Sequence, residues 1–93
     1  MNKNEYLDKS SYIMASSYRS KILKSLYGEE IYKTPTQLAK DTGIKRNHIS
    51  NVLVDLKKTK YVECVNENRR KNRLYCLTQF GKDIYNFIGE IGD

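Results

Sequence analysis

The chain has 93 residues, of which 39% are hydrophobic, and a formal net charge of +6 with a pI near 9.3. This length favours one small domain with a modest core, so a partner subunit would add stability. The two cysteines, Cys64 and Cys76, exclude a secreted disulfide scaffold. The N-terminal stretch lacks the apolar core of an export signal, and no apolar run approaches membrane-spanning length. We therefore expect a cytoplasmic protein with no membrane partner.

The positive charge is concentrated in one segment. Residues 45–73 contain nine basic and three acidic residues, and the remaining residues balance to zero. A localised basic surface favours a polyanionic partner, and nucleic acid is the first class to consider.

The first third of the chain predicts one helix after a polar start. Residues 1–9 are polar and predict a flexible arm, so the domain is expected over residues 10–93. Ser10 or Ser11 can cap a helix that runs to about Tyr27, with apolar residues at spacings of three and four. A short strand is possible at Ile31–Tyr32.

The stretch TPTQLAKDTG has clear signals for the start and the end of a short helix. Thr34 is the expected N-cap, Pro35 suits the first helical position, and Gln37 completes a capping box. Gly43 supplies the positive φ that ends the helix.

The next helix is predicted from about Arg46 to Lys58. Its apolar stripe is formed by Ile49, Val52, Leu53 and Leu56. The helical period places Asn47, Asn51 and Val54 on the opposite, outward face.

The periodicity then changes to that of β-structure. YVECVN and LYCLT favour two strands joined by a basic tip, residues 67–73. Thr78 can cap a last helix through about Ile88. The expected fold class is mainly α with a small β-hairpin (α+β), in the order α-(β)-α-α-β-β-α.

This order, together with two stretches, resembles winged helix-turn-helix transcriptional regulators of the MarR/ArsR/PadR type, especially small archaeal or bacterial ones. The stretches are TPTQLAKDTGIKRNHISNVLVDLKKTKYVE and RLYCLTQFG, and the second matches the pattern Tyr-x-Leu-Thr-x-x-Gly. The chain departs from the family at Lys60, where glycine is usual, and at Asn51, where arginine is frequent.

The resemblance implies a sequence-specific regulator that binds double-stranded DNA and is nucleoid-associated. Its third helix, residues 46–58, would enter the major groove with the N-terminal half nearest the bases. Asn47 and Asn51 are the expected base readers, since an amide can bond adenine bidentately. Arg46 would meet a guanine or a phosphate. The remaining expected contacts on this helix are Lys45, His48 and Ser50.

Two other elements are expected to contact DNA. The wing cations would reach a minor groove or flanking phosphates, where the negative potential favours arginine; they are Arg69, Arg70, Lys71 and Arg73. Thr36 and Gln37, at the start of the second helix of the motif, could donate to a phosphate.

A homodimer is expected, because one winged helix covers too little DNA for strong specificity. Family members of this size commonly pair through the first and last helices. The apolar residues available there are Tyr12, Met14, Tyr18, Phe80, Tyr85, Phe87 and Ile88.

Three other classes of function are compatible with a small domain of this composition to different degrees. An enzyme is not expected, because no catalytic constellation or phosphate loop is present. A metal- or redox-responsive sensor would use Cys64 and Cys76, which flank the wing tip symmetrically and could face each other. However, two thiols and a distant His48 fall short of four ligands, so no cofactor is expected. A winged helix that binds protein would not carry two jointly basic elements.

Overall fold

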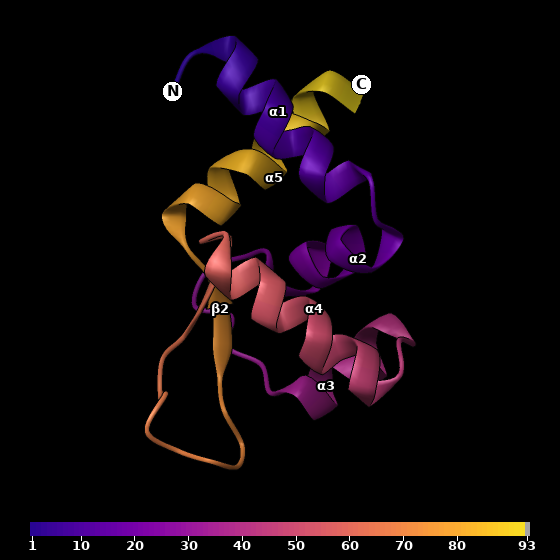
Figure 1. Cartoon of the computed structure of the whole chain (residues 1–93), viewed down its shortest axis with the longest axis vertical. Helices are drawn as coiled ribbons and strands as arrows, with labels where there is room; N and C mark the ends of the chain where they lie inside the picture. Colours follow the sequence, from indigo (N-terminus) through magenta and orange to yellow (C-terminus); the bar gives the residue numbers. More distant parts are fainter. Residues whose placement is uncertain (93) are drawn as a thin grey trace.

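The computed structural model describes residues 1–92, which form five helices and one two-stranded antiparallel hairpin. In chain order the elements are α1 (Lys3–Met14), α2 (Ser17–Leu26), α3 (Pro35–Thr42), α4 (Arg46–Lys58), β1 (Val62–Cys64), β2 (Tyr75–Leu77) and α5 (Gln79–Gly92). Figure 1 shows α1 and α5 together at one end of the molecule, with α3 and the hairpin loop at the other. The expected fold class is confirmed. Within the described range no helix is long and apolar enough to cross a membrane.

The N-terminal segment is helical, so the predicted flexible arm over residues 1–9 is wrong. Asn2 caps α1, and its side chain accepts a hydrogen bond from the amide of Glu5 at 2.9 Å. Tyr6 stacks on Phe87 of α5 with ring centroids 5.2 Å apart, and Ile13 is fully buried. The segment is polar and its apolar stripe is sparse, so tertiary packing against α5 stabilises a helix that local pattern alone does not indicate.

The helix predicted from residue 10 or 11 to about 27 is broken in two. The chain turns at Ala15 and Ser16, and the Ser16 side chain caps α2 by accepting from the amide of Arg19 at 3.3 Å. The Arg19 guanidinium lies 3.8 Å from the centre of the Tyr12 ring and donates to the Tyr12 carbonyl at 2.8 Å. The arginine therefore fastens the turn between the two helices.

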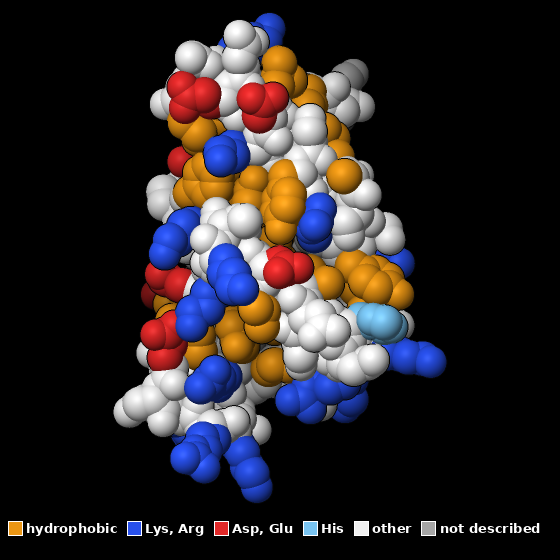
Figure 2. Space-filling view, viewed as in Figure 1, with side chains coloured by type: hydrophobic (Ala, Val, Ile, Leu, Met, Phe, Trp, Pro, Cys, Tyr) orange, Lys and Arg blue, Asp and Glu red, His pale blue; other side chains and the backbone are white. Residues whose placement is uncertain are grey.

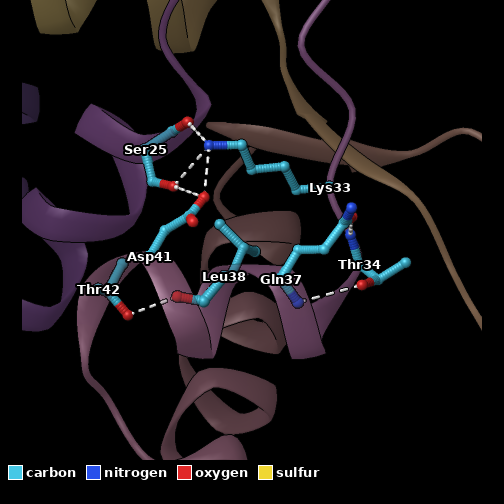
Figure 3. Close-up of polar contacts among 7 residues, drawn as sticks. All are labelled: Ser25, Lys33, Thr34, Gln37, Leu38, Asp41 and Thr42. Atoms are coloured by element: carbon cyan, nitrogen blue, oxygen red, sulfur yellow. Dashed lines mark hydrogen bonds and ion pairs between the residues drawn. The ribbon is translucent and has the colours of Figure 1, made fainter.

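The connector after α2 contains a single bridge in place of the strand proposed at Ile31–Tyr32. Lys33 pairs with Tyr75 of β2, with N···O distances of 3.0 and 2.9 Å. The Lys33 ammonium group donates to the Ser25 carbonyl and to the Asp41 carboxylate, both at 2.7 Å (Figure 3). It also holds the pKa of Asp41 below its ordinary value. One lysine thus ties α2, α3 and the hairpin together.

The two helices of the central motif begin and end as predicted. Thr34 and Gln37 form a complete capping box, and Gly43 ends α3 in the left-handed conformation with φ of 74°. Helix α4 spans Arg46–Lys58 and buries Ile49, Leu53 and Leu56. The caps are local signals, which explains why the sequence locates them well.

The hairpin and α5 are joined by a compact turn. Lys60, at the usual glycine position, has φ of 71°. The Thr78 hydroxyl donates to the Lys60 carbonyl at 2.6 Å and accepts from the amide of Gly81 at 2.9 Å, which makes Thr78 the N-cap predicted for α5. Helix α5 continues past the predicted end at Ile88 to Gly92.

Tyr61 is the largest fully buried side chain of the core. Its hydroxyl donates to the Lys9 carbonyl of α1 at 2.7 Å, and its ring packs between Tyr12 and Phe80, with centroids 5.5 and 4.9 Å away. Burial raises its pKa to about 12. The start of the hairpin is therefore anchored to both terminal helices.

Candidate nucleic-acid interface

Helix α4 presents a polar face to solvent above a buried apolar stripe. The predicted contacts on it and at its N-cap are all exposed: Lys45, Arg46, Asn47, His48, Ser50 and Asn51. Beneath them Ile49 is fully buried. The polar face of this half of the helix can therefore contact a partner while the apolar face stays packed in the core.

Most of these side chains remain available for bonding. Within residues 1–92, the Ser50 hydroxyl is the one side chain of this set that makes a hydrogen bond, to the Arg46 carbonyl at 3.2 Å. His48 lies against the ring of Tyr18 of α2, with centroids 5.6 Å apart. Val54 is 53% exposed on the same face. The surface thus offers amides, cations and one apolar side chain to a partner.

The N-terminus of α3 lies beside this face. The Gln37 side-chain carbonyl accepts from the Thr34 amide at 2.8 Å, and the Thr34 hydroxyl accepts from the Gln37 amide at 3.2 Å (Figure 3). The capping box thus uses the oxygen of Gln37, while its NH₂ group makes no hydrogen bond within residues 1–92 and remains a free donor. Thr36 is exposed at the second position of the helix.

The hairpin loop, residues 65–74, is called the wing. Its cations differ in whether their side chains make hydrogen bonds within the protein. Arg69, Arg70 and Lys71 are exposed, and within residues 1–92 none of their side chains makes a hydrogen bond or ion pair. Arg73 is half-buried, and its guanidinium donates to the carbonyls of Glu67 at 3.1 Å and Arg69 at 2.6 Å.

An ion pair joins the wing to α4. The Lys57 ammonium group contacts the Glu67 carboxylate, with side-chain exposures of 42% and 55%. The pair raises the pKa of Lys57 and lowers that of Glu67. Since both groups are largely exposed, the pair orients the wing more than it stabilises the fold.

A groove of about 490 Å³ lies between these three elements. It is lined by Thr34, Pro35 and Thr36 of the α3 start, Arg46, Ser50, Leu53 and Val54 of α4, and Arg70, Lys71, Asn72, Arg73 and Tyr75 of the hairpin. Five of these lining residues were not predicted as part of the site: Thr34, Pro35, Leu53, Asn72 and Tyr75. Strand alternation was the available signal for Tyr75, but the two strands are too short to show it clearly.

Charge is distributed unevenly over the molecule. In Figure 2 the lysine and arginine side chains gather at the end that carries the wing, and no acidic side chain is visible at the tip of that end. The acidic side chains lie higher, at mid-height and toward the α1–α5 end. The predicted basic segment is therefore also a basic surface, continuous with the groove.

Known family models and curated proteins give no match to the sequence, but solved structures match the fold. A protein described as a MarR-family transcriptional regulator from Enterococcus faecalis V583 matches with a TM-score of 0.79 at 16% identity, over 99% of this chain and 84% of that one. MepR of S. aureus, solved in a DNA complex, gives 0.76 at 19% identity, over 97% and 75%. The chain has the winged-helix fold.

The same winged helix also occurs in proteins with other described roles. The type III plasmid segregation protein TubR matches with a TM-score of 0.76 at 12% identity, over 97% of this chain and 87% of TubR. At such identities the likeness concerns the fold, so the function must be argued from the surface of this chain.

Most of the residues expected at a dimer interface pack within this winged helix. Tyr12 stacks on Tyr61, and Phe87 stacks on Tyr6. The ring centroid of Tyr85 lies 4.7 Å from that of Tyr27. Phe80 and Ile88 are half-buried against the core. Met14 and Tyr18 are exposed, at 47% and 37%. Tyr18 lies on α2, whereas the exposed apolar side chains on α1 and α5 are Leu7, Met14 and Ile91.

The two cysteines do not face each other, contrary to the sequence-based expectation. Cys64 lies opposite Tyr75, and Cys76 opposite Glu63. The strands are shifted by one residue from the register that would pair the two cysteines. The two thiols therefore lie on opposite faces of the hairpin. Burial raises the pKa of Cys76. Within residues 1–92 no group of three or more His, Cys, Asp or Glu side chains could hold a metal ion.

Proposed function

We propose that the chain is a sequence-specific transcriptional regulator that binds double-stranded DNA. The observation that carries the proposal is the continuous basic surface formed by the exposed face of α4, the start of α3 and the wing around one groove. The fold shared with MepR, which was solved with DNA, supports it. A surface that combines amides with unpaired cations suits both the base edges and the phosphates of a duplex.

In this proposal α4 lies in the major groove. Asn47 and Asn51 read adenine through paired hydrogen bonds, and Arg46 bonds a guanine or a phosphate. Val54 meets a thymine methyl group. Lys45, His48 and Ser50 contact the edge of the groove or the backbone.

The remaining contacts position the helix. Thr36 and the Gln37 NH₂ group donate to a phosphate at the start of α3, where the helix dipole favours an anion. Arg69, Arg70 and Lys71 enter a minor groove or bind flanking phosphates. Arg73 is predicted from the sequence in the same role, but its guanidinium donates to two carbonyls of the wing.

The proposed regulator acts as a homodimer on a pseudo-palindromic site, because a single module gives limited specificity. The apolar side chains still exposed on α1 and α5, Leu7, Met14 and Ile91, support pairing through this end. Sedimentation at micromolar concentration is expected to give a dimer, and a monomer would contradict this part of the proposal.

Selection of bound duplexes from a random pool tests the function. We expect an enriched motif with two half-sites in inverted orientation. If each subunit neutralises roughly five to seven phosphates, log K should fall with log[salt] at a slope of about −5 to −6 per subunit. Retention of protein without any enriched motif would refute sequence-specific binding.

A second candidate is a DNA-binding role in plasmid segregation, because the match to TubR spans nearly all of both chains. The two roles differ in where the protein binds in the cell. Mapping of bound DNA by immunoprecipitation should find separate sites upstream of genes for a regulator. A single cluster of sites on one replicon would favour segregation.

A further inference from the structure

The guanidinium of Arg73 faces into the wing. Its Nε atom lies 2.6 Å from the Arg69 carbonyl oxygen, and its Nη2 atom lies 3.1 Å from that of Glu67. The side chain therefore crosses from the returning strand of the wing to the outgoing one. In contrast, the three neighbouring cations of the wing, Arg69, Arg70 and Lys71, are exposed.

Asn66 closes the loop from the opposite strand. Its Oδ1 atom accepts from the amide of Leu74 at 2.8 Å, and its Nδ2 atom donates to the Asn72 carbonyl at 3.2 Å. The Arg69 amide donates to the Asn66 carbonyl at 3.0 Å, and Asn72 adopts a left-handed φ of 56°. Beyond the short ladder one further backbone bond joins the strands, from the Val65 amide to the Leu74 carbonyl at 2.9 Å. The Asn66 side chain then satisfies backbone groups on the returning side of the loop.

The ion pair between Lys57 and Glu67 fixes this loop relative to α4. Of the two carbonyls that Arg73 binds, one belongs to Glu67, whose carboxylate makes that ion pair, and the other to Arg69, which is one of the exposed cations. A change at Arg73 would therefore alter how the exposed cations of the wing are directed relative to α4.

We propose that Arg73 is a positioning residue that holds the wing in its DNA-binding shape and directs Arg69, Arg70 and Lys71. The inference rests on the proposed DNA-binding function. Four cations within five positions repel one another, and the two carbonyl dipoles that accept from Arg73 offset part of that repulsion. The rigid, planar fork of arginine offers donors on two separate nitrogens, Nε and Nη2, to the two carbonyls. A lysine has only one nitrogen and does not reproduce this geometry. A wing that is ordered before binding loses less conformational entropy on DNA.

Affinity measurements on the selected duplex distinguish positioning from direct contact. Arg73→Gln should weaken binding about tenfold, and Arg73→Lys by nearly as much, because charge alone does not restore the fork. In a background with Arg69→Gln, Arg70→Gln and Lys71→Gln, Arg73→Gln should add less than about twofold. Wild-type affinity for Arg73→Lys, or a full additional loss in the triple background, would overturn the inference in favour of a phosphate contact.

Amide hydrogen exchange in the free protein gives a readout that needs no DNA. Arg73→Gln should speed exchange at the amides of Arg69 and Leu74, while the amide of Leu53 in α4 stays protected as the folding control. Unchanged exchange in the wing would also overturn the inference. Absence of DNA binding by the wild-type protein would instead refute the proposed function, and the exchange experiment would still decide the role of Arg73.

Discussion

Gly81 of α5 packs directly against the backbone carbonyl of Tyr61, so closely that a Cβ atom at this glycine would lie 2.2 Å from the carbonyl oxygen. No flexible side chain is involved that could move aside. The contact explains why the close of the hairpin motif ends in glycine: the last helix can approach the hairpin only where no side chain intervenes.

Gly81→Ala should therefore destabilise the protein by about 2–3 kcal/mol, since either the helix or the hairpin must shift. Gly89→Ala on the same helix is the matched control, because nothing lies within 4 Å of a Cβ there. It should raise stability by about 0.5–1 kcal/mol through helix propensity. Urea unfolding of both variants measures the difference, and equal stabilities would contradict the packing argument.

Lys60→Gly should stabilise the protein by about 0.5–1 kcal/mol. The φ of 71° at this position is costly for a lysine and is accessible to glycine without strain. Lys58→Gly, at the end of α4, removes the same charge without relieving a positive φ and should be destabilising. Thermal unfolding of the two variants should shift in opposite directions, and a lower Tm for Lys60→Gly would show that the lysine is not strained.

The stability of the protein should fall in strong alkali because of Tyr61. Its pKa rises from 10.0 to about 12 in the folded protein, so the neutral phenol favours folding. The contribution is complete below pH 10 and is lost as the pH rises through 12. In Tyr61→Phe the urea midpoint should depend less on pH over this range than it does in the control variant Tyr27→Phe. Tyr27 is 41% exposed. Equal slopes for the two variants would contradict the burial argument.

Asn51→Ala and Arg70→Ala should affect DNA binding in different ways. Loss of a base-reading amide should reduce affinity for the selected site about tenfold or more and leave scrambled DNA almost unaffected. Loss of the wing cation should weaken binding to both duplexes and reduce the salt slope by about one. Titrations of each variant on both duplexes test the pair. Equal losses for Asn51→Ala on the two duplexes would remove it as a base reader.

The sequence predicts best those features that short-range chemistry determines. The capping box of Thr34 and Gln37, the left-handed Gly43 and the bounds of α4 all depend on neighbouring residues. The N-cap at Ser16 is also local, but the longer apolar pattern concealed it. Features that depend on distant partners were not predictable, among them α1, which is stabilised by the packing of Tyr6 on Phe87.

For the candidate site the same limit applies. Helical period correctly placed Asn47 and Asn51 on an exposed face of α4. It could not distinguish Arg73 from the cations beside it, because their difference lies in hydrogen bonds to carbonyls of the opposite strand. Whether Cys64 and Cys76 lie opposite each other depends on the register of the two strands. The sequence does not determine this register to within one residue.

The capping box at the start of α3 has a consequence for molecular recognition. The side-chain oxygen of Gln37 accepts a hydrogen bond from the amide of Thr34, so the donors of its NH₂ group are left for other partners. A glutamine is ordinarily ambivalent and can turn to suit either a donor or an acceptor. Here the cap holds the oxygen in place, so in the proposed interface Gln37 would donate to an oxygen or a ring nitrogen and would disfavour an amino group. A glutamate in its place would keep the cap and reverse this preference.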